Sequence, residues 1–147
     1  MALSGANSTG GGAGRPDLVH GASHPALFGM QVLVVEDEPL VAMVLEDMLA
    51  DFGCTLAGSA ATLSEALSAI AAGAEVDAAI LDVNLGGQKI FPVADLLAER
   101  GVPFVFSTGY GPADLTERYP GHPMLHKPYQ PEELAQVLLE FAWGPGH

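Results

Sequence analysis

From residue 31 onward, short apolar runs alternate with longer stretches in which apolar residues recur at helical spacing. The runs of strand length cover residues 31–35, 54–61, 76–83, 102–108 and 123–127. The stretches with helical spacing cover residues 39–52, 62–72, 90–100 and 131–143. Strands that alternate with helices predict a parallel sheet with helices on both of its faces.

Residues with strong positional preferences mark the predicted helix ends. Pro39 suits the first turn of a helix, Gly53 suits the position just after one, and Thr62 with Glu65 forms a capping box. Proline and glycine clusters interrupt residues 109–122, so this stretch predicts at most a short helix. The predicted fold class is therefore α/β, with a five-stranded, doubly wound parallel sheet and a short or irregular fourth helix.

The composition is that of a single domain, and it indicates where this domain begins and ends. Hydrophobic residues make up 49% of the 147 residues, which is enough to build one buried core. Residues 1–29 are rich in Gly, Ser and Ala and lack a hydrophobic period, so we expect a disordered N-terminal tail. The folded domain is predicted over residues 30–143, and residues 144–147 form a short C-terminal tail.

The charge balance disfavours two kinds of partner. Eighteen acidic residues against five Lys and Arg give a net charge of −13, whereas nucleic acids and anionic membranes attract clustered cations. The sequence contains no apolar stretch of the roughly 18 residues that a membrane span needs. Its single cysteine, Cys54, cannot form an internal disulfide. We expect a cytoplasmic protein that binds neither nucleic acid nor membrane.

Polar residues follow four of the predicted strands. Glu36, Asp37 and Glu38 follow the first strand, and Asp82 ends the third. The hydroxyls of Ser107 and Thr108 end the fourth strand, and Lys127 ends the fifth. Each alone suits a helix cap, a turn or a solvated surface. Because the carboxyl ends of parallel strands share one edge of the sheet, the sequence predicts that they form one pocket.

The chemistry of this pocket follows from its charges. Clustered carboxylates repel one another, and a hard divalent cation such as Mg²⁺ prefers oxygen ligands and often bridges to phosphate. An ionised Asp82 between that cation and Lys127 is placed to attack a phosphoryl group and form an acyl phosphate. The cation, Lys127 and the Thr108 hydroxyl would then hold the phosphoryl oxygens.

These motifs resemble the receiver domain of two-component response regulators. The resemblance rests on VVEDEP, ILDVN, the Thr of FSTGYG and the Lys-Pro of HKPY, and it covers about residues 30–143. It implies that Asp82 is the phospho-acceptor and a metal ligand. It also implies that Glu36, Asp37 and the backbone carbonyl of Asn84 bind Mg²⁺. Glu38 is expected to face the entrance of the site and the partner.

The resemblance assigns further roles beyond the acids. Thr108 would be the switch hydroxyl and Lys127 the phosphate-binding lysine, with a cis peptide between Lys127 and Pro128. Met124 stands where receivers usually carry an aromatic switch residue, so an aromatic rotamer switch is not expected. The run FSTGY resembles an alphaproteobacterial subgroup with a Phe-Ala-Thr-Gly motif, commonly served by HWE-type histidine kinases. Tyr110 either covers the site and a partner surface or packs on the short fourth helix.

The expected function is that of a stand-alone receiver and not of a turnover enzyme. It would take a phosphoryl group from a histidine kinase or a histidine phosphotransferase. It would then signal by protein contact, or act as a phosphate shuttle or sink. Two alternatives remain: a small Mg²⁺-dependent phosphatase with an aspartyl-phosphate intermediate, and an interaction module that is never phosphorylated. The phosphatase usually needs a second acid beside Asp82, and the sequence has Asn84 there.

Overall fold

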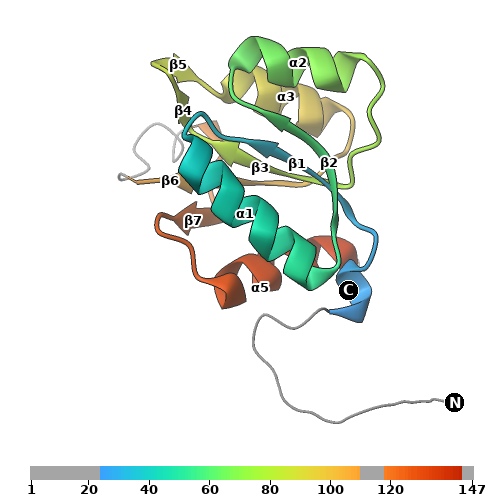
Figure 1. The fold of residues 1–147 in the computed structure, drawn as a ribbon. Coiled ribbons are helices and arrows are strands. Elements are labelled where there is room, and N and C mark those ends of the chain that lie inside the picture. The colour runs from blue at the N-terminus through green and yellow to red at the C-terminus, as the bar shows by residue number, and fades with distance from the viewer. Residues whose placement is uncertain (1–23, 110–117, 144–147) are drawn as a thin grey trace, which may run out of the picture.

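Five parallel strands form the central sheet of the computed structural model, in the order β2-β1-β3-β6-β7 (Figure 1). The structure describes residues 24–109 and 118–143. The strands are β1 (Gln31–Val35), β2 (Thr55–Ala60), β3 (Ala78–Asp82), β6 (Phe104–Thr108) and β7 (Met124–His126). This order confirms the predicted doubly wound sheet, and the strand order reverses between β1 and β3, where such sheets bind their ligands.

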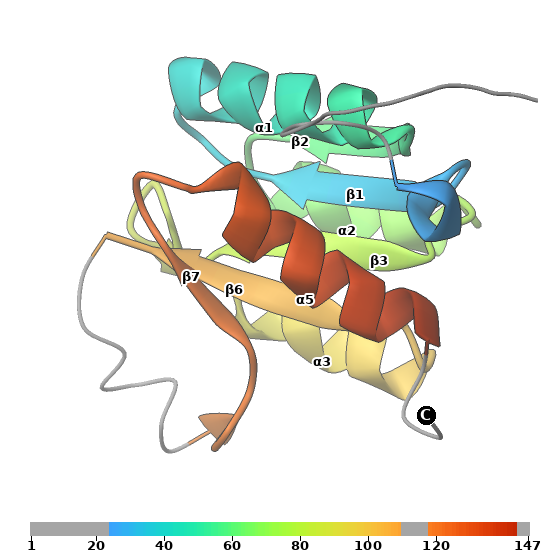
Figure 2. The ribbon, with the colours of Figure 1, turned by 90° about the horizontal axis from the view of Figure 1, so that it is seen from below.

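Helices cover both faces of the sheet, as the alternating pattern predicts. Two of them, α1 (Pro39–Phe52) and α5 (Pro131–Trp143), lie on one face. Among the described residues, α2 (Leu63–Ala71) and α3 (Phe91–Glu99) lie on the opposite face (Figure 2). No helix in these described parts of the chain is long and apolar enough to cross a membrane.

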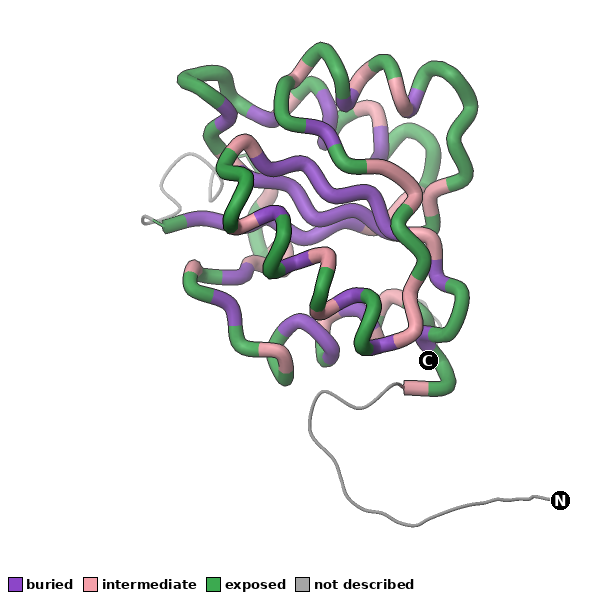
Figure 3. Tube along the Cα trace, in the orientation of Figure 1, coloured by how far each residue is buried: buried purple, intermediate pink, exposed green. Residues whose placement is uncertain are grey.

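The hydrophobic core is divided by the sheet into two layers. Leu45 and Leu49 of α1 pack with Leu134 and Leu138 of α5 against one face. The second layer lies under α2 and α3 on the other face. Every residue of β3 and β6 is buried, and Figure 3 shows the central strands as the most enclosed part of the chain. Burial on both faces explains why these strands are continuously apolar in sequence.

The helix ends follow the predicted signals. Pro39 is the first residue of α1, and Gly53 ends it with a φ of 90°, a left-handed conformation that favours glycine. The Thr62 side chain accepts a hydrogen bond from the Glu65 amide at 3.1 Å. Glu65 in turn accepts from the Ala61 amide at 2.8 Å, one residue before the position that a capping box predicts.

The fold begins earlier than the sequence predicts. Residues 24–29 fall in the expected tail, but Pro25–Leu27 form a 3₁₀ helix, η1, that contacts α5. The Leu27 side chain is fully buried in the layer under α1 and α5. The Gly29 amide donates to the Gly53 carbonyl at 2.8 Å. Residues 1–23, residues 144–147 and most of the predicted fourth helix lie outside the described residues.

A short hairpin after β3 is a feature that the sequence does not predict. Strands β4 (Asn84–Leu85) and β5 (Gln88–Lys89) pair in antiparallel fashion. Gly86 and Gly87 connect them with φ angles of 52° and 88°, as a two-residue turn with left-handed residues requires. The buried Leu85 side chain attaches the hairpin to the layer under α2 and α3.

Candidate functional site

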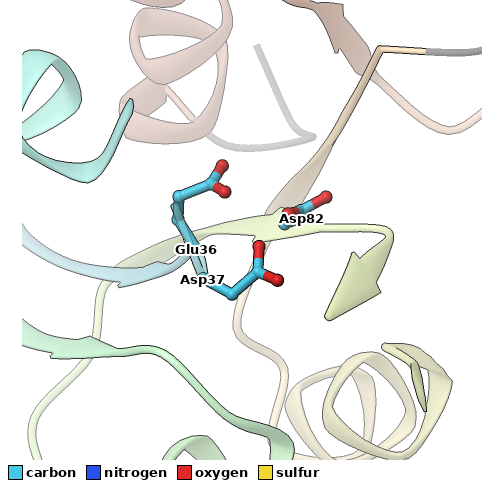
Figure 4. A group of neighbouring side chains, drawn as sticks. All are labelled: Glu36, Asp37 and Asp82. Atoms are coloured by element: carbon cyan, nitrogen blue, oxygen red, sulfur yellow. The ribbon is translucent and has the colours of Figure 1, made fainter. Parts of the chain in front are cut away.

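Three acidic side chains converge at the carboxyl edge of the sheet. Glu36 and Asp37 directly follow β1, and Asp82 is the last residue of the neighbouring strand β3. One carboxylate oxygen from each lies within 4.8 Å of the other two (Figure 4). Glu36 is 3% exposed and Asp82 is 6% exposed. The predicted acidic cluster is therefore present, and two of its three members are buried.

Lys127 reaches this cluster from the end of β7. Its ammonium nitrogen Nζ lies 3.0 Å from Glu36 Oε1 and 3.4 Å from Asp82 Oδ2. The backbone amide of Lys127 donates to the Thr108 carbonyl at 3.0 Å, which fixes the start of the loop after β7. The following Lys127–Pro128 peptide is cis, as predicted. The lysine therefore contacts the acceptor candidate and one of the predicted metal ligands.

Burial and mutual repulsion dominate the electrostatics of the site. Burial, followed by the charge of Glu36, raises the pKa of Asp82 from 3.8 to about 7, although Lys127 and the Asn84 amide oppose the rise. Burial also acts to lower the pKa of Lys127, but Glu36 and Asp82 outweigh it and the pKa is raised. Lys127 thus stays charged at neutral pH. One lysine cannot neutralise three carboxylates, so the site retains an excess of negative charge.

Backbone amides hold each carboxylate in place. The Glu38 amide donates to Glu36 Oε2 at 3.1 Å. The Asn84 amide donates to Asp82 Oδ1 at 3.3 Å. The Gly86 amide, at the tip of the β4–β5 hairpin, donates to Asp37 Oδ2 at 3.0 Å. The hairpin therefore orients one of the acids of the cluster.

The donor set fits a hard divalent cation. All three acidic side chains offer oxygen atoms, which Mg²⁺ prefers. The Glu36 Oε1 atom is buried and, among the described residues, has no hydrogen-bond partner, although the Lys127 ammonium lies within ion-pair distance. A buried oxygen of this kind is costly unless something else satisfies it. The role of the Asn84 carbonyl as a further ligand stays a prediction.

The remaining predicted residues lie around this centre. Thr108 is buried at the end of β6, one residue beyond Ser107, which pairs in register with Asp82. Glu38 has a 63% exposed side chain and lies 3.7 Å from Lys127 Nζ, at the entrance of the site. Met124 is half-buried in β7 and packs against the layer under α2 and α3. Tyr110 lies outside the described residues.

Two contacts beside the site are not predicted from the sequence. Tyr129 is buried next to Lys127 and Pro128, and its hydroxyl hydrogen-bonds the Ser107 hydroxyl. Tyr119 packs its ring against Phe106, with centroids 5.4 Å apart, in the layer that also contains Met124. A tyrosine after Lys-Pro and a hydroxyl inside an apolar strand are the only sequence signals for the first contact, and neither names its partner.

Comparison with known proteins agrees with this geometry. The chain belongs to the response regulator receiver domain family, whose model matches residues 32–139. That range contains the acidic cluster and Lys127. The resemblance inferred from the sequence is thus confirmed, and with it membership of a family that acts in two-component signalling. Members of this family generally bind Mg²⁺ at an acidic pocket and are phosphorylated on an aspartate.

Two individual proteins, PhyR and SdrG, are similar to this chain. The chain is 33% identical over 129 residues to the phyllosphere-induced regulator PhyR of Methylorubrum extorquens, across 84% of this chain and 48% of PhyR. It therefore spans about half the length of that relative. The solution structure of SdrG from Sphingomonas melonis Fr1 is 46% identical, covers 78% of this chain and 96% of SdrG, and has a TM-score of 0.68. SdrG is also known in a BeF3-activated conformation.

The receiver domain of PhyR from Erythrobacter litoralis is a further structural relative. It is 30% identical, covers 81% of this chain and 94% of that domain, and has a TM-score of 0.70. Both solved relatives are matched over nearly their whole length. The similarity to these relatives extends over most of the sheet and its helices rather than over the acidic motif alone.

Proposed function

We propose that the protein is a response regulator that accepts a phosphoryl group on Asp82 and changes its protein contacts as a result. The observation that carries the proposal is the position of Asp82 in a cluster of three carboxylates that can hold a cation, with the Lys127 ammonium 3.4 Å from its Oδ2. Such a carboxylate is a nucleophile with positive charge available on both sides. The BeF3-activated conformation of the similar protein SdrG supports this reading, because BeF3 is a phosphoryl analogue.

The proposed transfer uses few groups. A carboxylate oxygen of Asp82 attacks the phosphorus of a phosphohistidine, and an O–P bond forms as the P–N bond breaks. The electron pair of the broken bond stays on the imidazole nitrogen, which takes a proton from solvent. Lys127 and the Thr108 hydroxyl hold two phosphoryl oxygens. Glu36, Asp37 and Asp82 would hold Mg²⁺, which would supply positive charge to offset the carboxylates and the charge of the phosphoryl group.

An apolar surface beside the site is suited to docking of the phosphodonor. Leu40, Met43 and Val44 on the outer side of α1 are 76%, 57% and 48% exposed. A groove of about 410 Å³ runs from α1 to the loop after β7. It is lined by Glu38, Leu40, Val41, Val44, Lys127, Pro128 and Tyr129. We propose that a helical histidine kinase, of the HWE type or another, or a histidine phosphotransferase binds here.

The output of the protein is part of the same proposal. The phosphorylated form would bind a downstream protein differently, or return the phosphoryl group to a histidine protein as a shuttle or sink. Either output requires that phosphorylation stabilise one conformation more than another. The proposal also implies a cytoplasmic protein, because histidine kinases take their phosphoryl group from ATP.

Incubation with Mg²⁺ and acetyl phosphate tests the acceptor. We expect one phosphoryl group per chain by intact mass, stable to acid and labile to base, and lost in Asp82→Asn. Asp47→Asn makes the same chemical change at an exposed position of α1 and should keep the adduct. A protein that forms no adduct would contradict the proposal. Continuous hydrolysis of the donor with many turnovers would support the phosphatase instead.

A second experiment tests the docking surface. Leu40→Asp places a charge in the apolar groove, so transfer from a cognate histidine kinase should slow by at least about tenfold, a loss of roughly 1.4 kcal/mol. Phosphorylation by acetyl phosphate should not change, because this donor needs no docking surface. Leu56→Asp is the control, since Leu56 is a 42% exposed leucine on β2 and does not line the groove. Equal kinase transfer to both variants would contradict docking at α1.

A further inference from the structure

Two buried hydroxyl groups meet beneath the site. Ser107 is fully buried in β6, and Tyr129 is 8% exposed in the loop between β7 and α5. Their side-chain oxygens form a hydrogen bond. A buried hydroxyl costs free energy unless it has a partner, so each of these groups depends on the other. The bond connects two segments that are 22 residues apart in sequence.

Ser107 is closely tied to the acceptor strand. It pairs in register with Asp82 of β3, and its carbonyl accepts a hydrogen bond from the Val83 amide at 3.1 Å. Side chains alternate along a strand, so Ser107 points to the same face as Val105, under α1 and α5. Tyr129 packs in that same layer. The backbone of Ser107 therefore pairs with the strand that carries Asp82, while its side chain bonds to Tyr129.

Tyr129 lies near Lys127 in the sequence. It stands two residues after Lys127, whose own amide is bound to the Thr108 carbonyl at 3.0 Å. The loop that carries Lys127 is thus attached to two adjacent residues of β6: the Thr108 carbonyl binds the amide of Lys127 itself, and the Ser107 hydroxyl binds the Tyr129 hydroxyl two residues later. Burial raises the pKa of Tyr129 to about 12, so its hydroxyl keeps its proton at neutral pH.

We propose that the hydrogen bond between Ser107 and Tyr129 positions Lys127 for phosphoryl transfer to Asp82. The inference rests on the proposed function, and it adds two positioning residues that do not themselves touch the phosphoryl group. With the bond in place, the ammonium stays within 3.4 Å of Asp82. Without it, the loop after β7 loses one of its two hydrogen bonds to the end of β6, and Lys127 samples positions farther from the acceptor.

The effect should appear in the rate and not in the affinity for the donor. Ser107→Ala and Tyr129→Phe each remove one hydroxyl and leave the packing of the side chain nearly unchanged. We expect each to slow the maximal rate of phosphorylation by acetyl phosphate about 3- to 10-fold, as the loss of one hydrogen bond allows. The donor concentration at half-maximal rate should change less than about twofold, because the positioned lysine acts on the transfer step.

A double-mutant cycle separates a working pair from two unrelated residues. If the two hydroxyls act through one bond, the double variant should be no slower than the slower single variant. The chain offers two matched controls that lose a hydroxyl elsewhere. Ser59→Ala removes a hydrogen bond to Glu46, and Tyr119→Phe removes one to Asp95. Both controls should be phosphorylated at the wild-type rate.

A second readout does not depend on phosphorylation. In metal-free protein, the Lys127 ammonium should give an NMR signal slowed in exchange by its contacts with Glu36 and Asp82. We expect this signal to broaden or disappear in Ser107→Ala and in Tyr129→Phe and to persist in the controls. Thermal unfolding of each variant reports any general loss of stability.

The outcomes distinguish the two proposals. Wild-type protein that is phosphorylated in an Asp82-dependent way, with both hydroxyl variants unaffected in rate and in the Lys127 signal, would overturn only the positioning role. Variants that lose stability without a change in rate or signal would overturn it in the same way. Wild-type protein that takes no phosphoryl group would overturn the proposed function, and the positioning role would fall with it.

Discussion

Removing the charge of Asp82 should stabilise the metal-free protein. Burial and the neighbouring Glu36 raise the pKa of Asp82 from 3.8 to about 7, so the folded state binds a proton that the unfolded state releases. The stability that comes from this proton is fully present below about pH 4. It is lost as the pH rises through about 7. At pH 8 the folded protein therefore contains a buried, charged carboxylate, and a neutral group at the same position would give the folded state a lower free energy.

The size of the effect follows from the same pKa values. A rise from 3.8 to about 7, at about 1.4 kcal/mol per pKa unit, corresponds to an upper bound of roughly 4 kcal/mol. Asp82→Asn should recover about half of this, roughly 2 kcal/mol, because the new amide also needs hydrogen-bond partners. At about 4 °C for each kcal/mol in a domain of this size, the unfolding midpoint should rise by about 8 °C.

Thermal and urea unfolding in the presence of a chelator measure this difference. The advantage of Asp82→Asn over the wild type should be largest at about pH 8 and should shrink as the pH falls to about 5, where the wild-type carboxyl is protonated in the fold. Asp47→Asn, at an exposed position, should show no such pattern. A variant less stable than the wild type at pH 8, or an advantage that does not depend on pH, would refute the electrostatic reasoning.

Three further predictions concern the cation, the hairpin and the N-terminal segment. Mg²⁺ at about 100 times its dissociation constant should stabilise the wild type by about 2.7 kcal/mol, and Asp37→Asn should lose most of this in a thermal titration. Gly86→Ala should cost about 1 kcal/mol in urea unfolding, because Gly86 has a φ of 52° that alanine adopts poorly; an unchanged midpoint would contradict this. Leu27→Ala should cost about 2–4 kcal/mol, because its side chain is fully buried; a loss below about 0.5 kcal/mol would show that η1 does not stabilise the domain.

The sequence predicts the position of the acidic cluster well, for a topological reason. A parallel sheet brings the carboxyl ends of its strands to one edge whatever the details of packing. Residues that directly follow β1 and β3, such as Asp37 and Asp82, are therefore placed by the strand pattern alone. The same holds for Lys127 at the end of β7. Strand periodicity and order are sufficient for this part of the site.

The contacts that the sequence does not predict depend on side chains from distant segments. Nothing in the periodicity near Ser107 or Tyr129 indicates that the two hydroxyls meet, since their bond depends on how the loop after β7 packs. Strands β4 and β5 contain two residues each, which is too short for an alternating pattern to appear. The Gly86-Gly87 pair predicts a flexible loop, and only the structure shows the hairpin.

The N-terminal boundary is missed for a related reason. Leu27 and Phe28 are isolated apolar residues among Gly, Ser, Pro and Ala, so they show no period of their own. The burial of Leu27 comes from a pocket that α1 and α5 build together. The ring of His24 also packs edge-on against the ring of Phe52, at the end of α1, with the ring centroids 5.6 Å apart. Such a segment is ordered by its surroundings and not by its own pattern.

The position of η1 shows at which end of the sheet a label can be attached to the protein. The segment precedes β1 and packs at the amino ends of the strands, whereas Asp82 lies at their carboxyl ends (Figure 1). A strand of five residues at about 3.3 Å each separates the two edges by roughly 16 Å. A tag, a fluorophore or a surface tether joined ahead of His24 is therefore attached at the edge of the sheet opposite the entrance at which we propose that the phosphodonor binds.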